Sequence, residues 1–98
     1  MKVNINSVHF KTDKKLDSFI NGKLQKLSSM YDGLIGSDVV LKVANDNEPE
    51  NKVAEIRLLI KGSDLFAKKK CKSFEEATDT AIEALRRQLK KHKEKLKK

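Results

Sequence analysis

The sequence lacks the residues on which several classes of protein depend. It has one cysteine, one proline, no tryptophan and only five aromatic residues among 98. Because a single thiol cannot form an internal disulfide, a disulfide-stapled secreted fold is excluded, and a reducing compartment, most simply the cytoplasm, is expected. No apolar run has the length of a signal peptide or of a membrane span. We therefore expect a mainly aliphatic core in a single domain, residues 1–98.

Groups arranged for catalysis or for metal binding are also missing. His9 and His92 lie far apart, and neither has a cysteine, histidine or carboxylate partner at a metal-ligand spacing. Cys71 has no recognisable base or acyl-transfer motif beside it. There is no glycine-rich phosphate loop, since Gly33 and Gly36 are predicted to be turn residues. The sequence thus predicts no catalytic residues, no metal, no cofactor and no enzymatic activity.

Positive charge is what the sequence has in excess, and it is concentrated at one end. The formal net charge is +8, and residues 86–98 (RRQLKKHKEKLKK) contain eight basic residues and one acidic residue. From totals of 22 basic and 14 acidic residues, this leaves 14 and 13 in residues 1–85, which are nearly neutral. Such an excess favours a polyanionic partner, with nucleic acid first and an acidic lipid surface second.

The first third of the chain predicts a strand followed by a helix. Residues 2–10 alternate apolar and polar with one slip of phase, as in a strand with a bulge. Thr12 is the expected N-cap of the helix, and Asp32-Gly33 is its expected stop. Apolar residues at helical spacing form its buried stripe: Leu16, Phe19, Ile20, Leu24, Leu27 and Tyr31.

Three further strands are predicted at residues 38–44, 53–60 and 64–72. Short polar connections make these three antiparallel neighbours. The first strand reaches the second through a helix, which is typical of a right-handed crossover between parallel strands.

A second helix is predicted from Phe74 to about Leu96, with Ser73 and Glu76 at the spacing of a capping box. At about 1.5 Å per residue it would be roughly 34 Å long, whereas an eight-residue strand covers about 27 Å, so its basic end should overhang the sheet. The element order is β-α-β-β-β-α. The predicted fold class is α+β: a four-stranded sheet with two helices packed on one face, like a double-stranded-RNA-binding domain.

The basic residues of the last helix are predicted to share an exposed surface. The apolar stripe of this helix runs through Leu85, Leu89, His92 and Leu96, with His92 expected to be a packed or capping residue. Two sets of cations lie away from it: Arg87, Lys91 and Lys98 opposite, and Arg86, Lys90, Lys93 and Lys97 on one flank.

Two other segments add positive charge. Lys23 and Lys26 of the first helix lie in the same face region, and Lys68, Lys69, Lys70 and Lys72 lie on the last strand. The strand lysines have two interpretations that stay open, RNA contact or protection of a sheet edge. Because exposed aromatic residues are not evident, phosphate contact with a folded RNA is favoured over stacking on a single strand.

Several short motifs are spaced along the chain from the first helix to the last. Leu85, Arg87-Gln88-Leu89 and Lys91-His92-Lys93 form a Leu-x-Arg-Gln-Leu-x-Lys-His-Lys run. Ala77 and Asp79 form an Ala-x-Asp after the Ser73-Phe74 cap, Lys23-Leu24 and Lys26-Leu27 precede Tyr31-Asp32, and residues 39–43 read VVLKV. In these features the sequence resembles the short ribosome hibernation promoting factors and the related ribosome-associated inhibitor, protein Y.

The resemblance implies a protein that docks on the small ribosomal subunit, in the channel of mRNA and the tRNA anticodon stems. It would thereby inhibit translation in stationary phase or under nutrient stress. The implied 16S rRNA contacts are Lys23, Lys26, Arg87, Lys91 and Lys93, which Arg86 and Lys90 join on geometry alone.

The sequence departs from the family pattern at three places. KTDKKL replaces the usual Glu-Leu-Thr-type helix entry, and KKKCK is more basic than the family's strand. A chain ending at Lys98 is expected to lack the added C-terminal domain by which long forms dimerise ribosomes, and the extended tail of protein Y. The resemblance to a short form implies paired inactive ribosomes, with a second small ribosome-modulating factor as a partner; silencing of single ribosomes stays open.

Two other functions remain as alternatives. A general structured-RNA-binding module would share the fold, but such modules carry lysines where this chain has Glu75, Glu76 and Asp79. A protein or anionic-lipid interaction module could use the last helix as an amphipathic peptide, although its apolar stripe is weak beyond Leu89.

Overall fold

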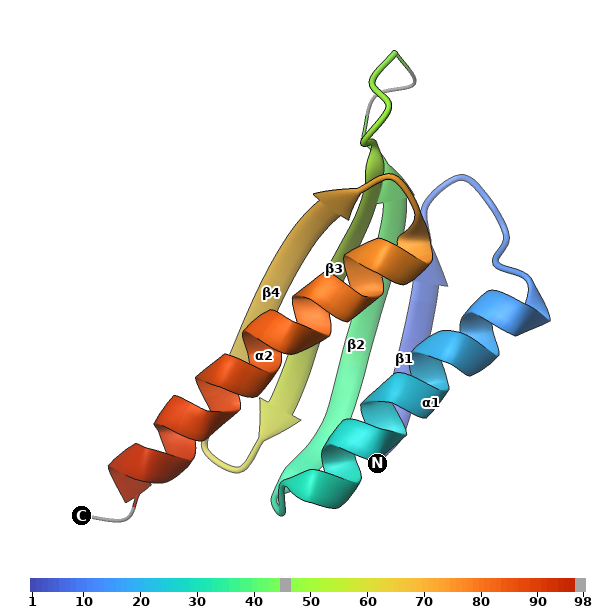
Figure 1. The fold of residues 1–98 in the computed structure, drawn as a ribbon. Coiled ribbons are helices and arrows are strands. Elements are labelled where there is room, and N and C mark those ends of the chain that lie inside the picture. The colour runs from blue at the N-terminus through green and yellow to red at the C-terminus, as the bar shows by residue number, and fades with distance from the viewer. Residues whose placement is uncertain (45–46, 97–98) are drawn as a thin grey trace.

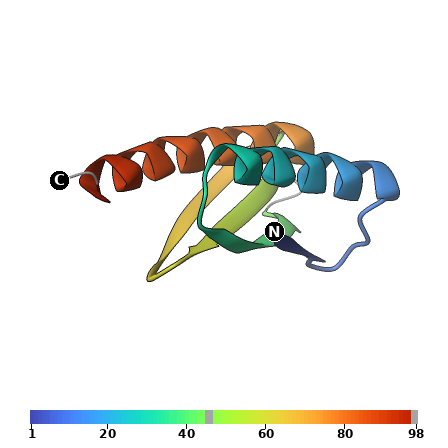
Figure 2. The ribbon, with the colours of Figure 1, turned by 90° about the horizontal axis from the view of Figure 1, so that it is seen from below.

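The computed structural model describes residues 1–44 and 47–96, with side chains described through Lys93. Four strands form one sheet in the order β1-β2-β3-β4, and both helices cover the same face of it (Figure 1). The view from below shows the two layers, helices over sheet (Figure 2). The elements are β1 (Lys2–Ser7), α1 (Lys14–Met30), β2 (Leu34–Val43), β3 (Lys52–Ile60), β4 (Ser63–Cys71) and α2 (Phe74–Leu96). The predicted α+β fold and its element order are confirmed.

Strand directions also follow the prediction. β1 pairs with β2 in parallel, and the pairs β2–β3 and β3–β4 are antiparallel. The chain passes from β1 to β2 through α1, because parallel neighbours need a crossover connection, which is usually a helix. The tight β3–β4 turn uses Gly62 at φ 80°, a left-handed conformation that glycine adopts without steric cost.

Two predicted details of the first third of the chain are wrong. β1 ends at Ser7 instead of continuing to Phe10, because His9 takes a positive φ of 64° that an extended strand does not allow. The N-cap of α1 is Asp13, whose carboxylate accepts a 2.8 Å hydrogen bond from the Leu16 amide. The Thr12 hydroxyl instead donates to the Asp17 carboxylate at 2.6 Å.

Gly36 is a strand residue and not the turn residue that was expected. It lies inside β2, next to an irregularity of register between Leu34 and Gly36. A Cβ atom at Gly36 would lie 3.1 Å from the Lys2 carbonyl oxygen of β1. The glycine therefore allows the close approach of the two parallel strands.

The core between sheet and helices is aliphatic, as predicted. Its fully buried large side chains come from both helices and the two central strands: Ile20, Leu24, Leu27, Val39, Leu41, Ile56, Leu58 and Leu85. Phe10 and Phe74 lie at its margin with stacked rings, 5.0 Å between centroids. Burial of these apolar stripes fixes which faces of α1 and α2 remain open to solvent.

α2 is longer than the sheet beneath it. It crosses β3 and β4, and its C-terminal turns extend past the β3–β4 turn in both views (Figures 1 and 2). The predicted overhang is therefore present. The predicted burial of Leu96 and the directions of Lys97 and Lys98 lie outside the described side chains.

Candidate nucleic-acid interface

The seven predicted contact residues lie on the helix layer, away from the sheet. We call them the basic surface: Lys23, Lys26, Arg86, Arg87, Lys90, Lys91 and Lys93. The opposite stripes of the same helices are buried, with Leu24 and Leu85 at 0% exposure and Leu89 at 4%. Because those stripes pack on the sheet, the cations of both helices are held in fixed directions outside it.

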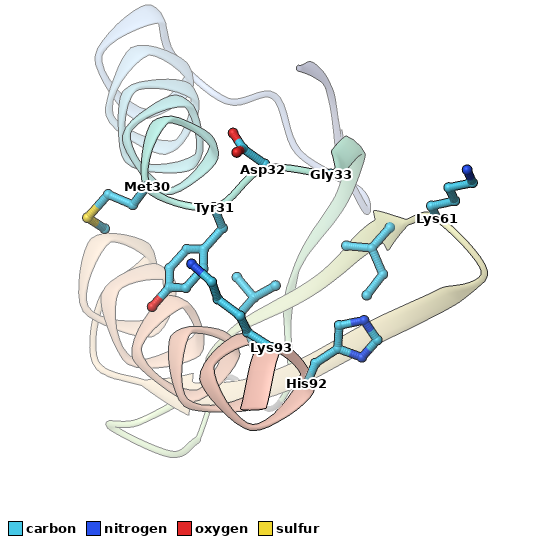
Figure 3. A pocket seen from close by; sticks show the side chains of 9 residues that line it. Met30, Tyr31, Asp32, Gly33, Lys61, His92 and Lys93 are labelled. Atoms are coloured by element: carbon cyan, nitrogen blue, oxygen red, sulfur yellow. The ribbon is translucent and has the colours of Figure 1, made fainter. Parts of the chain in front are cut away.

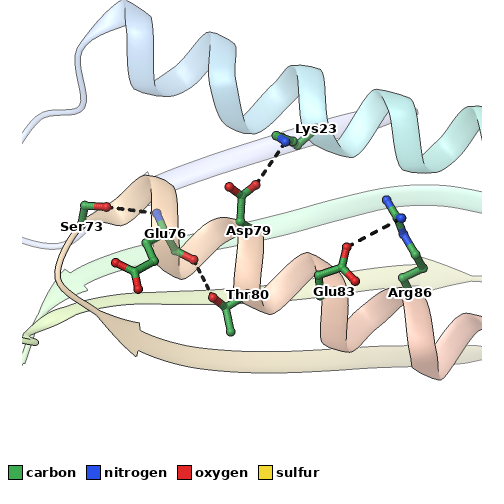
Figure 4. A network of polar contacts seen from close by, with 7 residues as sticks. All are labelled: Lys23, Ser73, Glu76, Asp79, Thr80, Glu83 and Arg86. Carbon is green, nitrogen blue, oxygen red and sulfur yellow. Dashed lines mark hydrogen bonds and ion pairs between the residues drawn. The ribbon is translucent and has the colours of Figure 1, made fainter.

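Polar anchors at two points fix the rotation of α2. The Ser73 hydroxyl caps the helix by accepting a 3.1 Å hydrogen bond from the Glu76 amide (Figure 4). Near the middle, the Gln88 side-chain amide donates to the Phe66 carbonyl of edge strand β4 at 2.9 Å. Gln88 thus faces the sheet edge, so its neighbour Arg87 points outward and is exposed.

Two of the predicted cations are paired with carboxylates of α2. Lys23 Nζ of α1 lies 3.3 Å from Asp79 Oδ1 of α2, and Arg86 Nη1 lies 3.7 Å from Glu83 Oε1 (Figure 4). The Lys23 and Asp79 side chains are 45% and 50% exposed. Exposed pairs of this kind contribute at most about 1 kcal/mol, so an incoming phosphate can compete for either cation.

The other cations of the basic surface have no such compensation. Arg87, Lys90 and Lys91 line one shallow depression on the outside of α2, together with Ala84 and Gln88. None of the ion pairs among the described side chains involves these three, Lys26 or Lys93. Positive charge is therefore partly neutralised near the start of α2, whereas at Arg87, Lys90 and Lys91 no described carboxylate compensates it.

The open face of the sheet is different, because its cations are paired. Glu55 is 2.7 Å from Lys42 Nζ and 4.0 Å from Lys68 Nζ, and Lys70 Nζ is 3.1 Å from Glu48. β4 is an edge strand, which is the location that edge protection by Lys68–Lys70 requires. Among the described side chains, Lys68 and Lys70 of β4 thus have carboxylate partners, whereas Arg87, Lys90 and Lys91 of α2 have none.

A pocket that the sequence did not indicate lies where the two helices end. It has a volume of about 240 Å³ and is bounded by residues from α1, α2 and the β3–β4 turn, among them Tyr31, Ile60, Lys61, Leu89 and His92 (Figure 3). Lys93 of the basic surface also lines it. No spacing along the chain could reveal this pocket, because its walls come from three separate segments.

Metal-binding and nucleophilic groups are sparse in the described part of the chain. No cluster of three histidine, cysteine or acidic residues could hold a metal ion there. The thiol of Cys71 is buried on β4, with Sγ 3.9 Å from Thr80 Oγ1. The arrangement offers cations and hydrogen-bond donors, which are groups suited to binding anions.

Neither described helix combines the length and the apolar composition that crossing a membrane would require. Moreover, the apolar stripe of α2 is already used against the sheet, with Leu85 and Leu89 buried.

Solved structures share this fold. The N-terminal domain of Thermus thermophilus Protein Y aligns with a TM-score of 0.80 at 22% identity, covering 94% of this chain and 99% of the other. A ribosomal subunit interface protein from Coxiella burnetii aligns with a TM-score of 0.84 at 17% identity, covering 95% and 98%.

Sequence comparison gives the family. Two similar proteins are both named ribosome hibernation promoting factor. The one from Pseudomonas putida is 33% identical over 95 residues, covering 97% of this chain and 89% of the relative. The one from Escherichia coli K12 is 32% identical over 97 residues, covering 99% and 98%. Residues 3–97 match the description "Sigma 54 modulation protein / S30EA ribosomal protein". The resemblance seen in the sequence is confirmed, and the chain belongs to this family.

Proposed function

We propose that this protein is a ribosome hibernation factor that binds the small ribosomal subunit through 16S rRNA and inhibits translation under stress or in stationary phase. It acts by occlusion: one domain occupies the channel of mRNA and tRNA, with no chemistry. The relatives named ribosome hibernation promoting factor support the hibernation role. Binding to the rRNA of the small subunit is proposed from the basic surface.

One observation carries the rRNA part of this proposal. Arg87, Lys90 and Lys91 are exposed around one depression on a rigidly oriented helix, and no described carboxylate pairs with them. Arginine and lysine side chains fixed in this way suit the phosphates of a folded RNA, since backbone contacts position a protein without reading bases. Lys26 of α1 and Lys93 of α2, both exposed, add to the same positive field.

The proposal is tested by reversing the charge of Arg87, Lys91 and Lys93 to glutamate. The variant should no longer co-sediment with small ribosomal subunits, because three phosphate contacts become repulsive. The matched control reverses Lys11, Lys14 and Lys15, which are exposed near the start of α1 and give the same change in net charge. Circular dichroism establishes that both variants are folded.

The control should sediment with the subunits nearly as well as the original protein. Equal loss of binding in both variants would mean that only total charge matters and would refute the site. Unchanged binding of the Arg87, Lys91 and Lys93 variant would refute it as well.

The alternative of a general structured-RNA module is separated by a gel shift. Plain duplex RNA should bind much more weakly than small subunits, because exposed Glu75 and Glu76 stand where such modules carry lysines. A lipid-binding role would require the buried stripe of α2 to leave the sheet, and liposome flotation tests it.

A further inference from the structure

The basic surface leads into the pocket at the C-terminal ends of α1 and α2. Lys23 of α1 pairs with Asp79 of α2, whereas no described carboxylate pairs with Lys93 farther along α2. Lys93 belongs to both features, since it lies on the basic surface and lines the pocket. A polyanion bound along the basic surface would therefore pass the mouth of this pocket.

The walls of the pocket are largely apolar and include one flat ring. Tyr31 points from the end of α1 toward α2 (Figure 3), and it is only partly buried against the core. Ile60 and Leu89 are buried, at 8% and 4% exposure, so they form a firm floor. An aromatic face beside aliphatic side chains suits a planar ring system.

Polar groups of the pocket are cationic or able to form hydrogen bonds. Lys93 contributes positive charge, and the His92 imidazole can exchange hydrogen bonds with a ligand. The Lys61 side chain extends away from these residues in Figure 3. The one acidic lining residue, Asp32, has its carboxylate turned to the side away from Lys93 in Figure 3. The pocket therefore suits a ligand that combines a flat ring with a negative group.

The size of the pocket limits the ligand to one ring system. Its volume of about 240 Å³ is below the range of roughly 300–1,000 Å³ that is typical of sites for drug-sized molecules. A single base fits this limit, while the attached phosphate would remain at the mouth, near Lys93.

We propose that this pocket binds one unstacked nucleobase whose phosphate is held by Lys93. Tyr31 stacks on the base, and His92 contributes hydrogen bonds to its edge. The pocket thus adds a base contact to a surface that otherwise contacts phosphates. This inference deepens the proposed function and rests on it for the identity of the RNA. The same chemistry also admits a free nucleotide.

The first test is a titration of the full chain with adenosine monophosphate, in which binding is monitored through backbone amide chemical shifts by NMR. Saturable shifts are expected at Tyr31, Lys61, His92 and Lys93. Ribose 5-phosphate carries the same anion without a base and should bind at least about fivefold more weakly, because it cannot stack. N-acetyl-phenylalanine carries a ring and a carboxylate and represents a peptide side chain. If either control ligand matches adenosine monophosphate, the base assignment is refuted.

Variants then assign the contact. Tyr31→Leu should weaken adenosine monophosphate about five- to tenfold and leave ribose 5-phosphate unchanged, because only the stack is lost. Phe66→Leu is the matched control, since Phe66 is a 44% exposed ring on the open face of the sheet, and it should change neither. Lys93→Gln should weaken both ligands by a similar factor, because both carry a phosphate. Unchanged binding in Tyr31→Leu would overturn the proposal.

Two further comparisons are needed. One distinguishes a base within RNA from a free nucleotide, and the other tests the pocket independently of the proposed function. If a five-nucleotide oligoadenylate binds more tightly than the mononucleotide, and an abasic central residue removes the gain, the base comes from RNA; equal affinities indicate a free nucleotide. If adenosine monophosphate fails to bind while charge reversal still abolishes co-sedimentation, the pocket is wrong and the proposed function stands. If adenosine monophosphate binds but charge reversal leaves co-sedimentation unchanged, the pocket is supported and the proposed rRNA site is refuted.

Discussion

At the scale of single residues, the pairing state of a cation decides its expected role. Lys23 and Lys93 were both predicted to contact rRNA, but Lys23 lies 3.3 Å from Asp79 whereas Lys93 has no described carboxylate partner. Binding of a phosphate by Lys23 must displace Asp79, which reduces the free energy gained. The contact between Lys23 and Asp79 could not be predicted from the sequence, because these residues are 56 positions apart in the chain.

Asp79→Asn is therefore expected to strengthen binding to the small subunit. Removing the carboxylate frees Lys23, and the unfolding free energy should change by less than about 1 kcal/mol because the pair is exposed. Affinity is measured by co-sedimentation and stability by urea unfolding. Asp64→Asn adds the same charge on the opposite side of the molecule, where Asp64 pairs with Arg57 at 3.9 Å. If both variants strengthen binding equally, the local pairing plays no part.

At the scale of secondary structure elements, α2 shows the closest agreement between sequence and structure. Its cap at Ser73, its start at Phe74 and its extension as far as Leu96 were all predicted, because local signals coincide along the helix. α1 agreed less well, since Thr12 and Asp13 are both good N-caps and only the folded chain selects Asp13. The hydrogen bond of Gln88 to Phe66 could not be predicted, because it depends on packing between α2 and β4.

Ser73→Ala should lower the unfolding free energy by about 1 kcal/mol, because the Glu76 amide loses its partner at the start of α2. Urea unfolding followed by circular dichroism measures this loss. Ser29→Ala is a suitable comparison, since the exposed Ser29 hydroxyl only donates to the Lys26 carbonyl within α1 and caps no helix start. Ser29→Ala is expected to change stability by less than about 0.5 kcal/mol. Equal losses in the two variants would contradict the capping role.

At the scale of the whole molecule, the two faces differ in charge compensation. The open face of the sheet carries paired cations, such as Lys42 with Glu55, whereas Arg87, Lys90 and Lys91 on α2 have no partner among the described carboxylates. The molecule is elongated, with extents of 48 × 24 × 18 Å, and α2 extends past the sheet at one end (Figure 1). Such a distribution orients the protein toward a polyanion before contact.

Affinity for the small subunit should therefore fall steeply with salt. If about five phosphates are neutralised, binding should weaken roughly 10²- to 10³-fold between about 50 and 200 mM salt, because bound counterions are released. Arg87→Gln should reduce the magnitude of the logarithmic salt slope by about 0.7–0.9, the contribution of one phosphate. Lys14→Gln, an exposed lysine outside the basic surface, should leave the slope unchanged. A slope that responds to neither substitution would argue against direct phosphate contacts.

The sequence by itself determined the order of the elements, the aliphatic core and the helix that carries the charge. These depend on local periodicity, capping and composition, which a chain carries wherever it folds. Only the tertiary structure decided which cations are free, because the pairs Lys23–Asp79 and Lys42–Glu55 join residues distant in sequence. It also decided that Gly36 lies within a strand and that Tyr31, Lys61 and His92 share one pocket. Contacts between distant segments exist only when the sheet and both helices are packed together, so no local pattern encodes them.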